Sequence, residues 1–445
     1  MPSHTPLNFS PAPLIYPPFT HTTRTVCFFA LGTTPWNPKN KNRVDDIRVT
    51  DQNPGIRDYE ASLLRLLDKL SNGMAVEINE SGTALKYKPG IVTGGRRITH
   101  DCGVSRGMGY FLEVVLTVAL FAKKAVDVTL TGITNDEAEL SVDTFRTVTL
   151  PMLKRQFGIE EGLSLQIVKR GCAPGGGGEI QLKLPIAKEL KNIDWTDEGL
   201  VKRVRGVAFT LRVSPQTGNR LVDASRGVLN KFLPDVYIFT DHHPGDGREG
   251  VNGKLRGKKS TPGFGISLVA ETTTGCLVGV DVASSAAKAA EEELDSPFGG
   301  GGGGSSNGDG SNGDGPNGGG GGSLLFGGNG NGNDNTHSGA KRGRGGVMVP
   351  EDMGTAITEA LVAEVQRGGV VDSSHQPLVL LLMSIGPEQI SRVRLGQLTP
   401  RAVQTLRIVK AFFGVTFNIQ PEPDSGTVFL STVGAGIKNI SRRAT

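Results

Sequence analysis

The chain has 445 residues, of which 37% are hydrophobic and 63 are glycine, so part of its length is not expected to enter a folded core. Its formal net charge of +4 excludes a polycation, and any binding to nucleic acid therefore depends on local basic patches. No apolar run reaches the roughly 20 residues that span a bilayer, and no secretory signal is visible. We expect a soluble intracellular protein without a membrane partner.

Residues 1–42 are rich in proline and have no clear period, which predicts an irregular N-terminus. A large α/β domain is expected to begin at residue 43 and to run to residue 184. Apolar spacing and turn residues within it predict the following elements in chain order. They are a helix over about 59–70, a hairpin of strands over 75–78 and 84–87, a buried helix over 110–120, a strand over 126–130, a helix over 142–157 kinked at Pro151, and a strand over 163–168.

Residues 185–285 predict a separate, smaller α/β unit. Its expected elements are a strand over 205–213, a helix over 216–232, a strand over 236–240 and a strand pair over 264–272 and 275–282. Residues 286–346 are dominated by Gly, Asn, Asp and Ser, a composition that cannot bury enough apolar surface to fold, so we expect a disordered linker. Its end, Lys341-Arg-Gly-Arg344, is more typical of a solvated linker than of an RNA contact or nuclear address. The larger domain is expected to resume over 347–445.

The segment Arg170-Gly-Cys-Ala-Pro-Gly-Gly-Gly-Gly-Glu-Ile180 predicts a loop that turns sharply into a strand. Its motif positions are Gly171, Pro174, Gly176, Gly177 and Gly178. Consecutive glycines take positive φ and permit close approach of another backbone or a phosphate, and an arginine at the mouth of the loop suits an anionic ligand. The alternative is a glycine hairpin or a hinge at a domain boundary.

This segment resembles the signature Arg-Gly-x-x-Pro-x-Gly-Gly-Gly-x-aliphatic of the RNA 3'-terminal phosphate cyclase family. Four further segments, 100–113, 130–136, 141–151 and 260–275, are similar to the nucleolar, cyclase-like branch of that family. The resemblance runs from about residue 43 to 283 and from about 347 to 417. It implies an α/β fold of repeated units, each with two helices on a four-stranded sheet, and an inserted smaller α/β domain. The family's first strand and its Gly-Gln-x-x-Arg segment are not found in residues 1–42. Either the fold begins differently here or these residues come from a mispredicted exon, and we favour the second interpretation.

The resemblance also implies where the chemistry of an active cyclase would lie. Such an enzyme activates the RNA 3'-phosphate with ATP through an adenylated histidine at the start of a helix near the C-terminus. Counting back from Phe412-Phe-Gly-Val-Thr-Phe417 places Arg401 at that position, and no histidine follows His375. Arginine stays protonated and cannot act as the nucleophile. We therefore expect no catalytic residue and no cofactor.

The cysteines and histidines give no strong indication of a metal site. Cys27, Cys102, Cys172 and Cys276 include no Cys-x-x-Cys pair, which supports neither a zinc site nor a disulfide framework. His375 is expected to be a capping or surface residue, and Asp241-His242-His243 to form a loop at the end of a strand. A metal site at His100-Asp101-Cys102 is also not favoured. Taken together, these segments predict that the protein binds no metal.

The basic residues carry the remaining functional signal. Arg106, Arg146, Arg170 and Lys183 lie in or beside the family's motifs, and the resemblance implies that they gather near a substrate cleft where they would bind phosphate. Each of them alone could equally be an ordinary solvated cation. Arg407 and Lys410, three residues apart on one helical face, are a further candidate. A second basic set lies in the smaller unit and consists of Lys202, Arg203, Arg205, Arg212, Arg220 and Arg226.

The resemblance implies a non-catalytic ribosome biogenesis factor of the small-subunit processome. Such a factor acts in pre-rRNA processing toward small-subunit rRNA and in 40S assembly, in the nucleus and nucleolus. Its implied partners are pre-rRNA and a ribosome-assembly GTPase. Two alternatives remain open, an endoribonuclease that cleaves pre-rRNA and an active ATP-dependent RNA 3'-phosphate cyclase. The nuclease would need a carboxylate from elsewhere, because Ile408 and Val409 supply none between Arg407 and Lys410.

Overall fold

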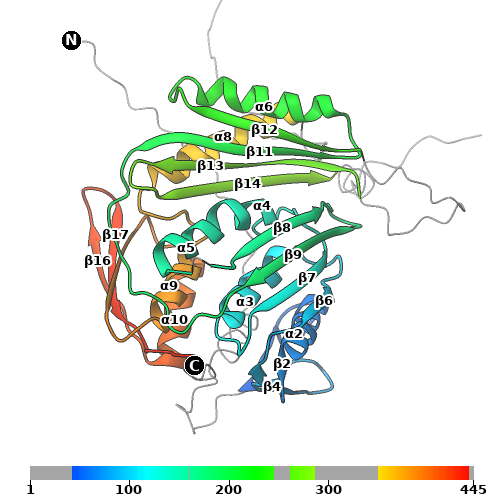
Figure 1. Cartoon of the computed structure of the whole chain (residues 1–445), viewed down its shortest axis with the longest axis vertical. Coiled ribbons are helices and arrows are strands. Elements are labelled where there is room, and N and C mark those ends of the chain that lie inside the picture. Colours follow the sequence, from blue (N-terminus) through cyan, green and yellow to red (C-terminus); the bar gives the residue numbers. More distant parts are fainter. Residues whose placement is uncertain (1–42, 160, 245–260, 286–348, 440–445) are drawn as a thin grey trace, which may run out of the picture. The chain divides into compact units, whose positions relative to one another are not determined.

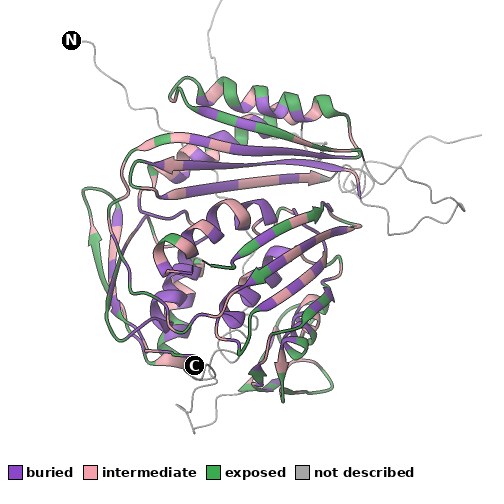
Figure 2. Cartoon of the chain, in the orientation of Figure 1, coloured by how far each residue is buried: buried purple, intermediate pink, exposed green. Residues whose placement is uncertain are grey.

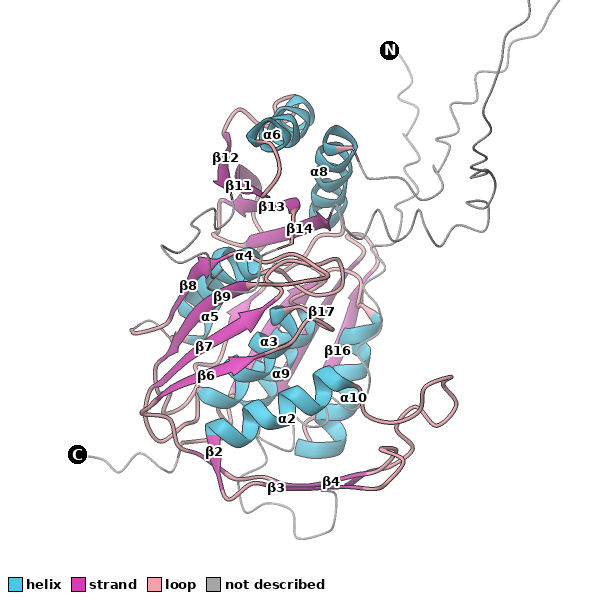
Figure 3. Ribbon diagram, turned by 90° about the vertical axis from the view of Figure 1, so that its right-hand side faces the viewer, coloured by secondary structure: helices cyan, strands magenta, loops and turns pink. Residues whose placement is uncertain are grey.

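The computed structural model describes residues 43–159, 161–244, 261–285 and 349–439, and all of them belong to one compact unit of the chain. They form three four-stranded sheets with helices packed against them, together with two small sheets near residue 43 (Figures 1 and 3). The predicted α/β class with repeated helix-and-sheet units is confirmed. No helix among the described residues is both long and apolar enough to span a membrane.

The first four-stranded sheet has the chain order strand, helix, strand, helix, strand, strand. Its strands are β6 (Arg97–Asp101), β7 (Val126–Gly132), β8 (Ser164–Lys169) and β9 (Gly178–Leu184), and its helical segments are α3 (Met108–Ala119), α4 (Val142–Thr144), the π-helical turn η1 (Phe145–Thr149) and α5 (Leu150–Phe157). The sheet order is β6-β7-β9-β8, and only the β6–β7 pair is parallel.

The same topology recurs at the C-terminal end of the chain. The elements are β10 (Asp194–Trp195), α9 (Gln376–Ile385), β15 (Ile390–Leu395), α10 (Pro400–Phe413), β16 (Asn418–Glu422) and β17 (Thr427–Val433). Their sheet order is β10-β15-β17-β16, again with a parallel first pair followed by two antiparallel pairs. Two copies of one unit are therefore present, and the smaller α/β unit interrupts the second copy between β10 and α9.

This inserted unit has its own sheet and its own hydrophobic core. Its elements are β11 (Val201–Leu211), α6 (Pro215–Leu229), β12 (Val236–His243), β13 (Gly263–Thr272), β14 (Leu277–Ser285) and α8 (Pro350–Gln366), with sheet order β12-β11-β13-β14. Met353, Ile357 and Leu361 of α8 are buried in the same core as Leu221 of α6.

That packing corrects two predicted boundaries. Residues 347–445 were assigned to the larger domain, but α8 covers the inserted sheet, because its apolar stripe is buried there. Residues 185–285 were assigned to the inserted unit, but β10 pairs with β15 of the large domain. The inserted unit therefore begins near residue 201 and is completed by α8.

The N-terminal part of the described chain contains α2 (Asp58–Leu70) and short strands. These strands are β1 (Arg43–Val44), β2 (Ser71–Asn72), β3 (Ala75–Ile78), β4 (Leu85–Lys88) and β5 (Ile91–Val92), in sheets of order β1-β4-β3 and β2-β5. The predicted helix and the hairpin of β3 and β4 are present. The predictions for residues 1–42 and 286–346, including Lys341–Arg344, lie outside the described residues.

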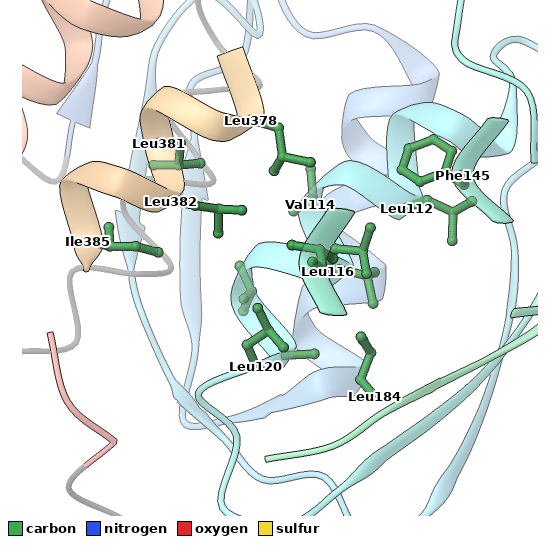
Figure 4. Close-up of a cluster of buried hydrophobic side chains, with 14 of the residues drawn as sticks. Leu112, Val114, Leu116, Leu120, Phe145, Leu184, Leu378, Leu381, Leu382 and Ile385 are labelled. Atoms are coloured by element: carbon green, nitrogen blue, oxygen red, sulfur yellow. The ribbon is translucent and has the colours of Figure 1, made fainter. Parts of the chain in front are cut away.

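The core of the large domain lies around α3 and α9, two helices that are apolar on nearly all sides and buried by the sheets and neighbouring helices (Figure 2). Figure 4 shows leucines from both helices pointing toward one another, with Phe145 and Leu184 completing the cluster. The labelled side chains are Leu112, Val114, Leu116, Leu120, Phe145, Leu184, Leu378, Leu381, Leu382 and Ile385.

The helix predicted over 142–157 is continuous but not regular. A kink was expected at Pro151, whereas the irregularity is the π turn η1, which ends immediately before α5 and its early proline. A proline has no N–H to donate and its ring crowds the carbonyl of the preceding turn. A widened turn before Pro151 accommodates both effects without ending the helix.

Candidate functional site

The glycine-rich loop connects β8 to β9 and packs tightly against the end of β7. Gly176 and Gly177 have φ of 67° and 89°, values that favour glycine. Any side chain at Gly171 would collide with the backbone nitrogen of Gly178 and approach the carbonyl of Gly132. The Gly171 carbonyl also accepts hydrogen bonds from the backbone N–H and the hydroxyl of Thr134, at 2.8 and 3.0 Å. The glycines thus serve close packing of backbone segments within the protein.

Arg170, at the mouth of this loop, is buried and fully engaged. Its Nη1 and Nη2 donate to the two carboxylate oxygens of Asp143 at 2.5 and 2.9 Å, and its Nε donates to Asp241 at 2.9 Å. The guanidinium also lies 4.8 Å from the ring centre of Phe209. Burial raises the pKa of Asp143, but Arg170, Asn135 and Arg146 together outweigh burial, and the net pKa is lowered. The predicted phosphate contact does not fit this arrangement, because Arg170 is 2% exposed and two carboxylates already neutralise its charge.

Arg146 lies beside this network and is more accessible. It extends from η1, its Nη2 lies 3.3 Å from Asp143 Oδ1, and its side chain is 38% exposed. Asp143 therefore brings Arg146 and Arg170 together, and of these two only Arg146 is partly open to solvent. The ion pair is thus solvated on the Arg146 side and buried on the Asp143 side.

A second cluster forms around Glu139, a residue that the sequence did not single out. Arg106 Nε donates to Glu139 Oε1 at 2.7 Å, and the guanidinium lies over the ring of Tyr59, 5.2 Å from its centre. Burial raises the pKa of Glu139 to about 7, while the positive charges of Arg106 and Arg401 oppose that shift. Arg401 therefore lies near Glu139. No spacing pattern pointed to Glu139, because its partners lie 33 residues before it and far toward the C-terminus.

One short segment joins the two clusters. Asn135 forms a β-bridge with Cys172 of the glycine loop, and its side-chain amide donates to Asp143 at 3.1 Å. Ile133 forms a bridge with Gly107, next to Arg106. The residues from Ile133 to Asp143 therefore place Arg106, Glu139, Arg146 and the glycine loop at one end of the first sheet. The candidate site is this end of the sheet, at the C-terminal end of β7.

The sequence of the chain is similar to that of known proteins over most of its length. The sequence profile of RNA 3'-terminal phosphate cyclase matches residues 39–419. The chain belongs to the RNA 3'-terminal phosphate cyclase family. A Dictyostelium discoideum relative, named as a probable RNA 3'-terminal phosphate cyclase-like protein, is 41% identical over 400 residues, which are 90% of this chain and 93% of the relative.

Two further relatives have informative names. The human RNA 3'-terminal phosphate cyclase-like protein is 40% identical over 407 residues, covering 90% of this chain and 91% of its own length. The Schizosaccharomyces pombe relative is 36% identical over 404 residues, covering 90% of this chain and 92% of its own, and its name is rRNA processing protein rcl1.

Within this family fold, Arg401 occupies the second position of α10. The helix begins at Pro400 and is capped by Thr399, whose hydroxyl accepts a hydrogen bond from the Ala402 N–H at 3.1 Å. The positive charge of Arg401 opposes the rise in the pKa of Glu139 that burial causes. Arg407 and Lys410 are exposed on the same helix, about 9 and 14 Å farther along its axis.

Lys183 does not join the other predicted basic residues. It pairs with Asp127 at the beginning of β7, whereas the glycine loop meets the end of that strand at Gly132. Five residues of extended chain separate Lys183 from Gly178, which corresponds to about 17 Å. Lys183 instead lines a surface pocket of about 380 Å³ together with Asp127 and Pro185.

The histidines are placed differently from the sequence expectation. His375 precedes α9 as predicted for a capping residue, but it is buried, not on the surface, and its Nδ1 lies 2.8 Å from Asp372 Oδ1. Asp241, His242 and His243 belong to β12 and not to a loop. His100 is buried with its Nε2 3.0 Å from Ser62 Oγ. Across the described residues, no group of three His, Cys, Asp or Glu side chains is arranged to hold a metal.

Proposed function

We propose that this protein is a non-catalytic rRNA-processing factor that uses the cyclase fold as a binding platform. The observation that carries the proposal is Arg401, which stands at the start of α10, beside Glu139, where the family resemblance implies the nucleophilic histidine. A guanidinium stays protonated and cannot accept AMP as an imidazole can. The name of the Schizosaccharomyces pombe relative supports the assignment to rRNA processing.

The finer assignment follows from the family resemblance. The protein would act in the small-subunit processome, on the pathway toward small-subunit rRNA and the 40S subunit, in the nucleus and nucleolus. Its partners would be pre-rRNA and a ribosome-assembly GTPase, and it would need no cofactor. RNA phosphates would contact the basic residues whose side chains are at least partly exposed, which are Arg106 and Arg146 at the candidate site and Arg407 and Lys410 on α10. Arg170 is left out of this set because Asp143 and Asp241 occupy it.

The first test is covalent labelling. The purified chain, incubated with ATP radiolabelled at the α-phosphate and Mg²⁺, is expected to remain unlabelled after denaturing electrophoresis. An Arg401→His variant is the matched comparison, because it returns an imidazole to the same helical position. An acid-labile adduct on the wild-type chain would overturn the non-catalytic assignment.

The second test addresses the process. Depletion of the protein from its own cells is expected to reduce small-subunit rRNA and to increase its unprocessed precursor, with large-subunit rRNA less affected. Wild-type protein should restore the pattern. An unchanged pre-rRNA profile after depletion would contradict a role in rRNA processing.

One observation favours a second candidate, the endoribonuclease. Glu139 has a pKa of about 7 and lies with two arginines, a combination that general acid–base cleavage of RNA could use. Its burial and its ion pair with Arg106 weigh against direct access to a substrate. Incubation of pre-rRNA with purified protein and Mg²⁺ is expected to produce no cut. Site-specific cleavage that disappears in Glu139→Gln would establish the nuclease instead.

A further inference from the structure

The two faces of the inserted sheet differ in what covers them. Val236 and Ile238 of β12 point into the core formed with α6 and α8, as do Val204 and Ala208 of β11. Successive residues of a strand point to opposite faces, so Tyr237 and Phe239 face away from these helices. Part of this opposite face, at β13 and β14, packs against α4, where Thr144 Oγ1 lies 3.3 Å from Ser267 Oγ. The part formed by β12 extends past this contact.

Tyr237 and Phe239 are unusually exposed for aromatic side chains in a strand. Tyr237 is 62% exposed and Phe239 is 44% exposed, and Figure 2 shows β12 alternating between buried and exposed residues. Among the described residues of β11 to β14, these two are the large apolar side chains that remain exposed. Because they are two residues apart on a strand, their rings stand side by side on one face.

Arginines lie next to these rings. Arg205 of β11 is in register with Tyr237, and residues in register on neighbouring strands share a face. Arg203, two residues earlier on β11, faces the same way. The two arginines are 35% and 39% exposed and pair with Glu271 and Asp235. The Arg205–Asp235 pair is exposed on both sides and contributes little, so this guanidinium can exchange it for a phosphate.

The face is also continuous with the candidate site. Asp241, two residues after Phe239 on the same side of β12, accepts the hydrogen bond from Arg170, and Arg170 shares Asp143 with Arg146. Four residues of strand separate Asp241 from Tyr237, a distance of about 13 Å. The two rings therefore lie on the same strand as a carboxylate of the Arg170 network, which also includes Arg146.

Two exposed rings suit stacked bases better than a protein surface. A stable protein–protein interface buries about 800 Å² on each partner around an apolar centre, whereas the exposed large apolar side chains here number two. Unpaired bases need only one ring each and a cation near the phosphate. A four-stranded sheet with helices on one face and aromatic rings on the other is also an arrangement that RNA-binding domains use to stack two or three bases.

We propose that Tyr237 and Phe239, flanked by Arg203 and Arg205, form a stacking platform for unpaired nucleotides of RNA. This inference rests on the proposed function, because it assumes an RNA partner. The inference adds that the RNA is single-stranded where it meets this face, and that the inserted unit carries a binding site for it. Double-stranded RNA would not use the platform, because its bases already stack on one another.

The test uses the full-length chain and two fluorescent RNA probes, a 12-nucleotide single strand and a duplex with the same strand. Alanine at Tyr237 or Phe239 is expected to weaken binding of the single strand about five-fold or more for each ring, while the duplex affinity stays unchanged. The exchange variant Tyr237→Phe with Phe239→Tyr keeps both rings and should bind as wild type. Phe232→Ala removes an exposed aromatic outside the strands and is the control for a general loss of apolar surface. Photo-crosslinking of 4-thiouridine RNA should map to Tyr237 or Phe239.

The outcomes separate this proposal from the proposed function. If wild type binds the single strand and the alanine variants bind it equally well, the platform is refuted and the proposed function stands. If wild type binds neither probe, the RNA contact of the proposed function fails and the platform fails with it. If the variants keep their RNA affinity but no longer sediment with pre-ribosomal particles, the face binds a protein, and the stacking proposal is overturned.

Discussion

At the scale of single residues, burial decides what the charged groups of this protein can do. Arg170 and His375 both looked accessible in the sequence, one at the mouth of a loop and one in a polar segment. In the structure each is at most 2% exposed and is held by carboxylates. Asp241 and Thr149, which also contact Arg170 and His375, lie 71 and 226 residues away, so no local pattern could have revealed these two contacts, although Asp372 lies only three residues before His375. Charge placed in such a network stabilises the fold and is not available to a ligand.

The His375–Asp372 pair gives a prediction about pH. Burial lowers the pKa of His375, but Asp372, assisted by Glu113 and Asp281, outweighs burial and raises it. A raised folded-state pKa means that protonated His375 stabilises the protein fully below its unfolded value of about 6.5 and that this contribution is lost as pH rises through the folded-state pKa. The pKa of Asp372 is lowered, so its own contribution is lost instead as pH falls.

We therefore expect the free energy of unfolding of the wild type to fall between pH 6 and pH 9, and to fall less in His375→Gln. Near pH 6 the variant should be about 3–5 kcal/mol less stable, because it leaves the Asp372 carboxylate buried without its partner. Urea denaturation at each pH measures both effects. Ser225→Ala is the matched control, since it removes a buried hydroxyl of the inserted unit that donates to the Gly354 carbonyl at 3.0 Å, and it should keep the wild-type pH slope. Equal slopes for wild type and His375→Gln would exclude the ion pair as their cause.

At the scale of helices and strands, hydrophobic periodicity predicted local structure well and domain membership poorly. The strand and helix that became β7 and α3 were predicted to within two residues at each end, because burial on one or both faces imposes a clear period. The assignment of α8 to the large domain was wrong. Its apolar stripe indicates that one face of the helix is buried, but it does not indicate which sheet covers that face. The second copy of the first helix-and-sheet unit could be expected only from the family resemblance. Its first strand, β10, has two residues, and the inserted unit separates that strand from the rest of the copy, so no sequence period marks it.

The packing of α8 can be tested by removing one side chain. Leu361 is 2% exposed and belongs to the core of the inserted unit. Leu361→Ala should cost about 2–5 kcal/mol, and hydrogen exchange should speed up first in the amides of β11 to β14. Leu382→Ala in α9, equally apolar and 1% exposed, is the matched control for the large domain. It should instead affect the amides of β15 and β17. Faster exchange in β15 and β17 after Leu361→Ala would mean that α8 stabilises the large domain.

At the scale of the whole molecule, the structure divides the predicted phosphate-binding residues between two ends of one sheet. Family motifs identified the loops correctly, and Arg106 and Arg146 do lie at the same end as the glycine loop. Lys183 lies in the same motif region of the sequence but at the far end of β9. Sequence proximity to a motif could not show this, because a strand of seven residues carries its last side chain about 20 Å from its first.

This division predicts how salt should affect RNA binding. Each phosphate neutralised by a cation contributes about 0.7–0.9 to the slope of log affinity against log salt concentration. Arg146→Gln should therefore flatten that slope by nearly one, because Arg146 is partly exposed beside the candidate site. Lys183→Gln removes the same charge at the opposite end and should leave the slope as in wild type, which makes it the matched control. The measurement is fluorescence anisotropy with labelled pre-rRNA fragments from 50 to 300 mM KCl, alongside melting temperatures that confirm folding. A slope that responds to Lys183→Gln and not to Arg146→Gln would move the RNA path to the pocket at the far end of the sheet.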